Sequence, residues 1–214
     1  MHFDMEKLGQ SQRYKLLTAL VIPRPIAWVS TLNVQGSVNL APYSFFNVMG
    51  NQPPIVAFGP GFRPDGSNKD TPANITRTGE FVINMVDRDL AAAMHQSAAP
   101  LAPGISEAEL LGLEMTPGHS IDTPGVLEAK VRLECVHQQT LKILDNQVVF
   151  GIVRHLYVAD GVVDPETLRL EPQAFIAVGR LQSPGRYSTS EDQFDLGSFP
   201  KDIIVDKSKP AGDS

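Results

Sequence analysis

The stretch RPIAWVSTLNVQGSVNLAPYSFF, residues 24–46, decides the fold. Its two halves, within residues 24–34 and 38–47, are rich in the apolar and β-branched residues that favour strands. Between them lies the turn Asn33-Val34-Gln35-Gly36, in which Gly36 can adopt a positive φ angle. Two such segments joined by a short turn predict a β-hairpin.

Further strands are expected on the C-terminal side of this hairpin. The most regular one covers residues 127–143, where apolar residues at odd positions alternate with charged residues up to Cys135. A period of two predicts one buried and one exposed or differently used face. The turn Asp145-Asn146 then leads into a partner strand at 147–158. The remaining expected strands are 54–58, 80–86 and 174–178.

Three short helices are expected between these strands. Thr71 would cap the first, with Pro72 at its first helical position and Gly79 at its end. Asp87 would cap a second helix that runs to about residue 96. Ser106 begins the capping-box pattern Ser-Glu-Ala-Glu and predicts a helical turn over 106–111.

The order of elements favours a mainly β protein with short helices. Six or seven strands, often joined as hairpins, do not alternate regularly with long helices, so a doubly wound parallel sheet is not expected. A β-barrel with helical insertions fits this order better. We expect a single domain over residues 1–214, with a core of about 14–187 and a C-terminal extension over 188–214.

Composition excludes several classes of protein. The 214 residues carry 18 basic and 24 acidic side chains, a net charge of −6, which argues against a nucleic-acid surface. A single cysteine, Cys135, forms no internal disulfide and is expected to be buried. No apolar run approaches a membrane span, the first residues do not resemble a signal peptide, and a cytoplasmic protein is expected. The histidines lack the spacing of a zinc motif, so no metal site is expected.

The segment Lys69-Asp70-Thr71-Pro72 suggests an anion site at the start of a helix. A helix N-terminus offers free N–H groups and a partial positive charge, to which Lys69 adds a full charge and Thr71 a hydroxyl. The alternative, and the commoner situation, is that Thr71 only caps the helix and Lys69 is solvated.

The predicted hairpin of residues 24–47 carries an unusual set of polar and aromatic residues. Hydroxyl and amide groups are poor choices for a plain hydrophobic core, because buried polar groups need partners. A ribityl chain or the polar edge of a flavin would supply such partners, and aromatic rings would form walls. The alternative is that the rings fill the barrel and the hydroxyls face water. The residues concerned are Ser30, Thr31, Asn39, Tyr43, Ser44, Phe45 and Phe46.

The ordered set of these motifs resembles the flavin-reductase-like family of FMN-binding split-barrel proteins. The resemblance covers about residues 14–187 and depends on the order of several short blocks. These blocks are residues 24–31, 39–46, 69–71 with 74–75, 81–84, 112–113, 133–135 and 151–153.

The resemblance implies a six-stranded Greek-key split barrel that forms a homodimer, with one FMN per subunit near the dimer interface. Lys69 and Thr71 would hold the phosphate, and Arg186 with Tyr187 would close the site. The isoalloxazine and ribityl groups would contact Ser30, Thr31, Asn39, Ala41, Pro42, Ser44 and Phe45.

The turn at residues 145–147 departs from the pattern of the shorter NAD(P)H:flavin reductases. Those reductases usually carry a Gly-Asp-His turn, and its histidine takes part in the use of the nicotinamide nucleotide. The matching turn of this chain is Asp145-Asn146-Gln147. The chain therefore looks closer to the flavoredoxin-like branch. The expected function is passage of electrons from NAD(P)H through FMN to flavin or another acceptor. The alternatives are a non-enzymatic FMN electron carrier and a ligand-binding module on the same barrel.

Overall fold

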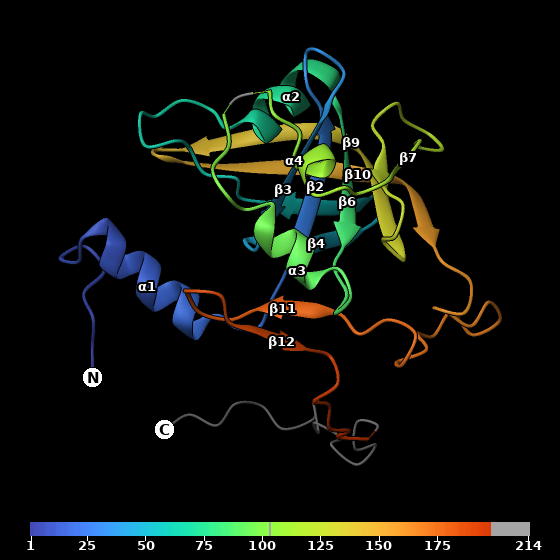
Figure 1. Cartoon of the computed structure of the whole chain (residues 1–214). Coiled ribbons are helices and arrows are strands. Elements are labelled where there is room, and N and C mark those ends of the chain that lie inside the picture. The colour runs from blue at the N-terminus through green and yellow to red at the C-terminus, as the bar shows by residue number, and fades with distance from the viewer. Residues whose placement is uncertain (103, 198–214) are drawn as a thin grey trace, which may run out of the picture.

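The computed structural model describes residues 1–102 and 104–197, and most of its strands belong to one antiparallel sheet (Figure 1). The order across this seven-stranded sheet is β3-β2-β6-β9-β10-β5-β4. Its strands are β2 (Ala27–Leu32), β3 (Val38–Tyr43), β4 (Phe46–Asn51), β5 (Pro54–Phe58), β6 (Glu80–Met85), β9 (Val131–Ile143) and β10 (Asn146–Val158).

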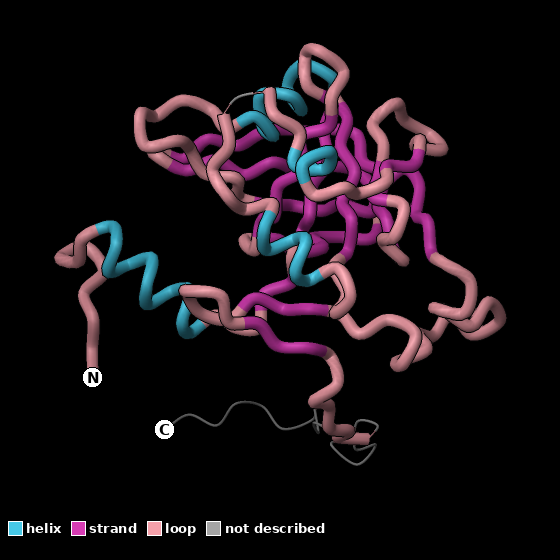
Figure 2. Tube along the Cα trace, in the orientation of Figure 1, coloured by secondary structure: helices cyan, strands magenta, loops and turns pink. Residues whose placement is uncertain are grey.

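The two edge strands of this sheet are neighbours in the sequence. Only Ser44 and Phe45 connect β3 to β4, and two extended residues span about 7 Å. The sheet must therefore roll until its edges approach, as Figure 2 shows for the strands of the main body. This confirms the predicted mainly β, split-barrel fold. The sheet has seven strands where six were expected, because the apolar run after residue 38 divides into β3 and β4.

Two smaller sheets complete the strands. The first has the order β1-β11-β12, from β1 (Arg24–Pro25), β11 (Val178–Arg180) and β12 (Tyr187–Thr189), and the second pairs β7 (Met115–Thr116) with β8 (Gly125–Val126). Two predicted boundaries were wrong. The strand expected at 174–178 is β11, which begins only at Val178. Strand β9 begins at Val131 and not at residue 127, because the residues before it form a turn in which the Ala129 N–H donates to the Val126 carbonyl.

The helices are α1 (Gln10–Leu20), α2 (Asp70–Thr78), α3 (Ala91–Gln96) and α4 (Glu107–Leu110). Gly79 ends α2 with a φ of 76°, and Ser106 caps α4 by accepting the Glu109 N–H, both as predicted. The prediction for Thr71 was wrong: α2 starts two residues earlier than expected, and Lys69 is its N-cap, with no side-chain cap bond. Helix α1 was not predicted, and in the described part of the chain no helix is long and apolar enough to cross a bilayer.

The interior of the barrel is closely packed. Phe58 and Phe81 are among the large side chains that are fully buried there, and Cys135 is buried as predicted. Trp28 is also fully buried, but on the opposite face of β2, in a second cluster with Met94 of α3. Gly151 lies against the Phe81 ring, where an added Cβ atom would come within 2.4 Å of the Phe81 Cζ atom. A glycine is needed at this position of β10 because the Phe81 ring occupies the space of a side chain.

Arg24 ties two peripheral segments to the barrel. Its buried guanidinium donates to the carbonyls of Thr18 and Val21 at the end of α1, at 2.7 and 2.6 Å. It also donates to the Leu181 carbonyl, 2.8 Å away, in the connection between β11 and β12. The Thr18 and Val21 carbonyls lie at the end of α1 and have no partner within the helix. The Arg24 guanidinium therefore anchors both α1 and the β11–β12 hairpin to the barrel.

Candidate functional site

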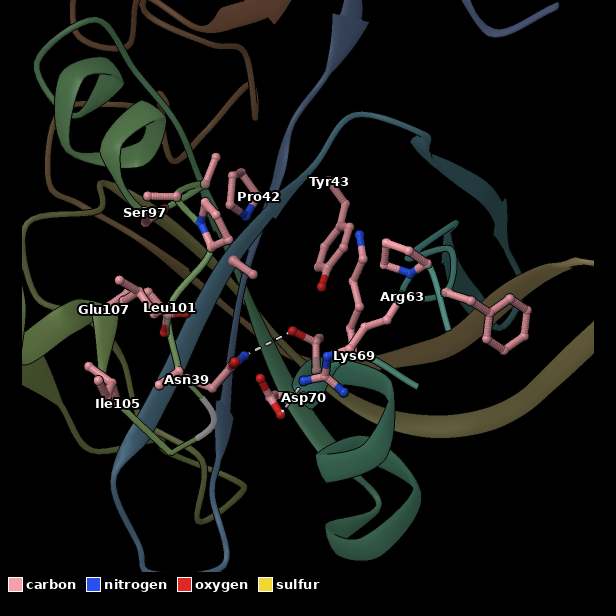
Figure 3. Close-up of a pocket in the computed structure, with 18 residues that line it drawn as sticks. Asn39, Pro42, Tyr43, Arg63, Lys69, Asp70, Ser97, Leu101, Ile105 and Glu107 are labelled. Carbon is pink, nitrogen blue, oxygen red and sulfur yellow. Dashed lines mark hydrogen bonds and ion pairs between the residues drawn. The ribbon is translucent and has the colours of Figure 1, made fainter. Parts of the chain in front are cut away.

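The candidate site is a cavity of about 550 Å³ beside the edge strand β3. It lies between the N-terminal end of α2 and the segment that leads from α3 to α4 (Figure 3). The described residues that line it are Asn39, Ala41, Pro42, Tyr43, Phe62, Arg63, Pro64, Lys69, Asp70, Thr71, 97–102, Ile105 and Glu107.

Lys69 provides the positive charge of this cavity. Its ammonium lies 5.8 Å from the centre of the Tyr43 ring. Burial, and then repulsion from Arg63, lower the pKa of Lys69. The ion pairs found among the described residues do not include it, whereas Arg63 is paired with Asp70 at 2.8 Å. Lys69 is thus a half-buried cation without a carboxylate partner in the described part, as an anion-binding site requires.

A buried hydrogen-bond network fixes the polar side of the cavity. Asn39 donates to the hydroxyls of Thr31 and Thr71, at 3.2 and 2.8 Å. Asn74 donates to Thr31 and to the Asn33 side chain, at 3.1 and 2.9 Å. Because the Thr71 oxygen accepts from Asn39, its own proton remains available for a further hydrogen bond.

The donors of the cavity fit a phosphate group. Lys69 offers an ammonium, Thr71 a hydroxyl proton, and the nine-residue α2 its N-terminal dipole. The opposite wall is largely apolar, with Leu101 and Ile105 labelled in Figure 3. A ligand with one phosphate and one flat apolar part matches both walls.

A second cavity of about 740 Å³ adjoins the first. Both are lined by Pro42, Tyr43, Phe62 and Lys69, so the two spaces share a wall. The bend between β3 and β4 places Ser44 and Phe45 in the second cavity, and Phe45 is 48% exposed.

The structure brings together seven of the eleven predicted site residues along β3 and the start of α2. Asn39, Ala41, Pro42, Lys69 and Thr71 line the first cavity. Ser44 and Phe45 line the second, together with Pro42 and Lys69 again.

The other four predicted residues line neither cavity. Thr31 is buried behind Asn39, and the Ser30 hydroxyl donates to the Pro124 carbonyl at 2.7 Å. Arg186 lies in the β11–β12 connection, and the Tyr187 hydroxyl is 2.9 Å from the His95 Nδ1 atom.

Glu107 lines the first cavity but was not predicted as a site residue. Its Oε2 atom accepts the N–H of Leu40 at 2.8 Å, while Ser106 donates to the Val38 carbonyl at 2.6 Å. Helix α4 therefore provides the open edge of β3 with hydrogen-bond partners that a further strand would otherwise supply. Burial raises the pKa of Glu107. The capping-box pattern marked this turn as a helix start, but nothing near it in the sequence indicated a partner on β3.

The rolled sheet and the cavity beside its edge strand, with Lys69 in its wall, define a split-barrel protein with a candidate site for an organic ligand that carries an anionic group. The family model described as "Flavin reductase like domain" matches residues 19–176. The chain belongs to this family, as the resemblance of its motifs predicted.

Solved structures of known proteins share the fold. The Pseudomonas fluorescens 2-nitrobenzoate 2-nitroreductase NbaA has a TM-score of 0.86 and 35% identity, covering 99% of this chain and all of that one. Nitrilotriacetate monooxygenase component B from Bacillus cereus has a TM-score of 0.85 and 32% identity, covering 92% and 98%. Flavoredoxin from Desulfovibrio vulgaris (Miyazaki F) has a TM-score of 0.71 at 17% identity, covering 96% and 99%, a likeness of fold.

Proposed function

We propose that the protein is an FMN-binding oxidoreductase that passes electrons from NAD(P)H through FMN to free flavin or another acceptor. The observation that carries this proposal is the half-buried, unpaired Lys69 at one end of a partly apolar cavity. Membership of the flavin reductase like family supports it. So does the similarity of the chain to a 2-nitrobenzoate 2-nitroreductase and to component B of a nitrilotriacetate monooxygenase.

In this proposal FMN lies along β3. Lys69 and Thr71 hold the phosphate, and Asn39 and Ala41 flank the ribityl chain. The ring system would lie past Pro42, which lines both cavities, towards Ser44 and Phe45 in the second cavity. Thr31 would support the site indirectly by accepting a hydrogen bond from Asn39, and Ser30 would support it through the packing of β2.

Bound flavin supplies the hydride and electron chemistry, so the residues of this chain need only bind, orient and shield it. Lys69 neutralises the phosphate, and the Asn39 network directs the Thr71 proton towards it. Phe45 and the residues 97–102 would limit access of water to the ring. No acid or base within the barrel is required.

Anaerobic reduction tests the electron donor. The FMN-loaded, desalted protein is expected to lose its oxidised-flavin absorption on addition of NADH or NADPH, and to recover it with an acceptor. Retained flavin that neither nucleotide reduces would exclude the reductase and favour the second candidate. Absence of both flavin retention and turnover with free FMN would exclude flavin binding.

The second candidate function is an FMN electron carrier that does not react with NAD(P)H. The observation that favours it is Gln147, which stands where the shorter reductases carry a histidine. Gln147 is buried and donates to the Gly61 carbonyl at 2.8 Å and the Asn68 side chain at 3.3 Å. Its side chain is therefore committed to the loop before α2 rather than to a second ligand.

We also propose a homodimer. Exposed apolar side chains on α1 and β4 support it, with Leu20, Val48 and Met49 at 74%, 61% and 58% exposure. Arg186 and Tyr187, which line neither cavity of their own protomer, would then contribute from the second copy. Light scattering of the purified protein distinguishes dimer from monomer. The cytoplasmic location stays a prediction from sequence.

The lowered pKa of Lys69 predicts a pH dependence of FMN binding. The protonated ammonium binds the phosphate, so affinity is full below this pKa and falls as the pH rises through it. The fall is expected at a lower pH than that at which a free lysine titrates. Equilibrium dialysis against FMN from pH 7 upward measures it.

The Lys69→Arg variant is the matched control for this titration, because a guanidinium stays protonated throughout the range. Its FMN affinity is expected to be nearly constant with pH. Riboflavin, which lacks the phosphate, should show no such fall with either protein. Identical FMN profiles for the two proteins would contradict the role of Lys69.

A further inference from the structure

Glu107 is a second half-buried charge in the first cavity, opposite in sign to Lys69. Figure 3 shows it on the α4 side of β3, across that strand from Lys69 and Asp70. One carboxylate oxygen is held by the Leu40 N–H at 2.8 Å, next in sequence to Asn39. No lysine, arginine or histidine among the described residues forms an ion pair with it.

The charged side chains that line the cavity cancel one another, which favours a ligand that carries little negative charge. Arg63 and Asp70 compensate each other at 2.8 Å, which leaves Lys69 positive and Glu107 negative. Arg63 and Lys69 are the cations among the described residues that line the cavity. A first phosphate would be met by Lys69 and Thr71, whereas a second phosphate in the same space would find only Arg63, already bonded to Asp70, and would share the cavity with Glu107.

We propose that Glu107 is a specificity-determining residue that makes this cavity select FMN, which has one phosphate, over FAD, which has two. The inference rests on the proposed flavin function and adds a choice between flavins. Like charges in a partly desolvated cavity repel far more strongly than in bulk water, since the effective dielectric constant is lower.

Affinities for FMN, FAD and riboflavin test this inference on the full chain by equilibrium dialysis. The Glu107→Gln variant keeps an oxygen that can accept the Leu40 N–H but loses the charge. The wild type is expected to prefer FMN, and E107Q to narrow the ratio of FMN to FAD affinity about tenfold, mainly through tighter FAD binding. Riboflavin affinity should hardly change, and the effect should shrink in high salt.

Glu109→Gln is the matched control, because Glu109 lies on the same helix, is exposed and lines neither cavity. It should leave the ratio unchanged. Equal ratios in wild type and E107Q, with FMN still bound, would overturn the inference and leave the proposed function standing. Equal weakening of FMN and riboflavin by E107Q would also overturn it, since Glu107 would then be an anchor for the common part of both ligands.

Failure of the wild type to bind any flavin would overturn the proposed function and this inference together. Competition by inorganic ions provides a test that needs no variant. Inorganic phosphate is expected to displace FMN from the wild type more effectively than inorganic pyrophosphate does. A stronger effect of pyrophosphate would contradict the role of Glu107.

Discussion

Replacing Lys69 and Thr71 together by alanine is expected to weaken FMN binding by roughly a hundredfold or more. Each residue contributes a hydrogen bond to a charged phosphate, and such bonds are worth about 1.5–3 kcal/mol each. Two of them correspond to at least two powers of ten in the dissociation constant. Equilibrium dialysis of the purified variant against FMN at pH 7 measures the loss.

Riboflavin separates loss of the phosphate contact from loss of the cavity. The affinity for riboflavin should fall less than threefold in the double variant, a loss of binding free energy below roughly 0.6 kcal/mol. The matched control is Lys142→Ala with Thr167→Ala, since both residues are exposed and line neither cavity. Unchanged FMN binding in the Lys69–Thr71 variant would favour the alternative of a barrel that binds a different ligand.

The Trp28→Ala substitution is expected to lower the free energy of unfolding by about 3–5 kcal/mol, more than any other single substitution described here. The side chain is fully buried between β2 and α3, in a cluster that includes Met94, and its Nε1 atom donates to the Ser97 hydroxyl at 2.9 Å. Truncation leaves a large cavity and removes the bond that fixes the start of the 97–102 wall. Chemical denaturation followed by circular dichroism measures the loss.

Trp28→Phe controls for the hydrogen bond alone. It keeps most of the apolar volume, and Ser97 retains its bond to the Met94 carbonyl at 2.8 Å, so the cost should be well below that of the alanine variant. Circular dichroism is the appropriate probe because Trp28 is the single tryptophan of the chain. Equal stability of wild type and Trp28→Ala would contradict the packing of this residue.

The features predicted well from sequence are those that neighbouring residues determine. The hairpin of residues 24–47 follows from its apolar pattern and turn, and the end of α2 from Gly79, which adopts a positive φ. Ser106 caps α4 because its hydroxyl and the Glu109 N–H are three residues apart. The expectation of an anion site at Lys69 used only the chemistry of a helix start, and it stays a prediction.

The features that sequence could not provide depend on residues far apart in the chain. Thr71 looks like a cap, but Asn39 approaches from β3 and takes its hydroxyl as an acceptor. Glu107 resembles any first-turn carboxylate until the edge of β3 is placed beside it. Helix α1 has no regular apolar stripe, and the tertiary bonds from Arg24 hold its end.

The two-residue link between β3 and β4 has a consequence for how this polypeptide folds. Three pairs of adjacent strands, β2–β3, β4–β5 and β9–β10, can form early, since each joins segments close in sequence. The pairing of β10 with β5 instead sets Val149 opposite Phe58, so a long loop must lose its entropy first. Folding should therefore be slower than that of a helical chain of equal length. The second cavity is lined by residues of both β5 and β10, so it is completed only when these strands pair. A ligand bound there would stabilise the finished fold by mass action without accelerating its earlier steps.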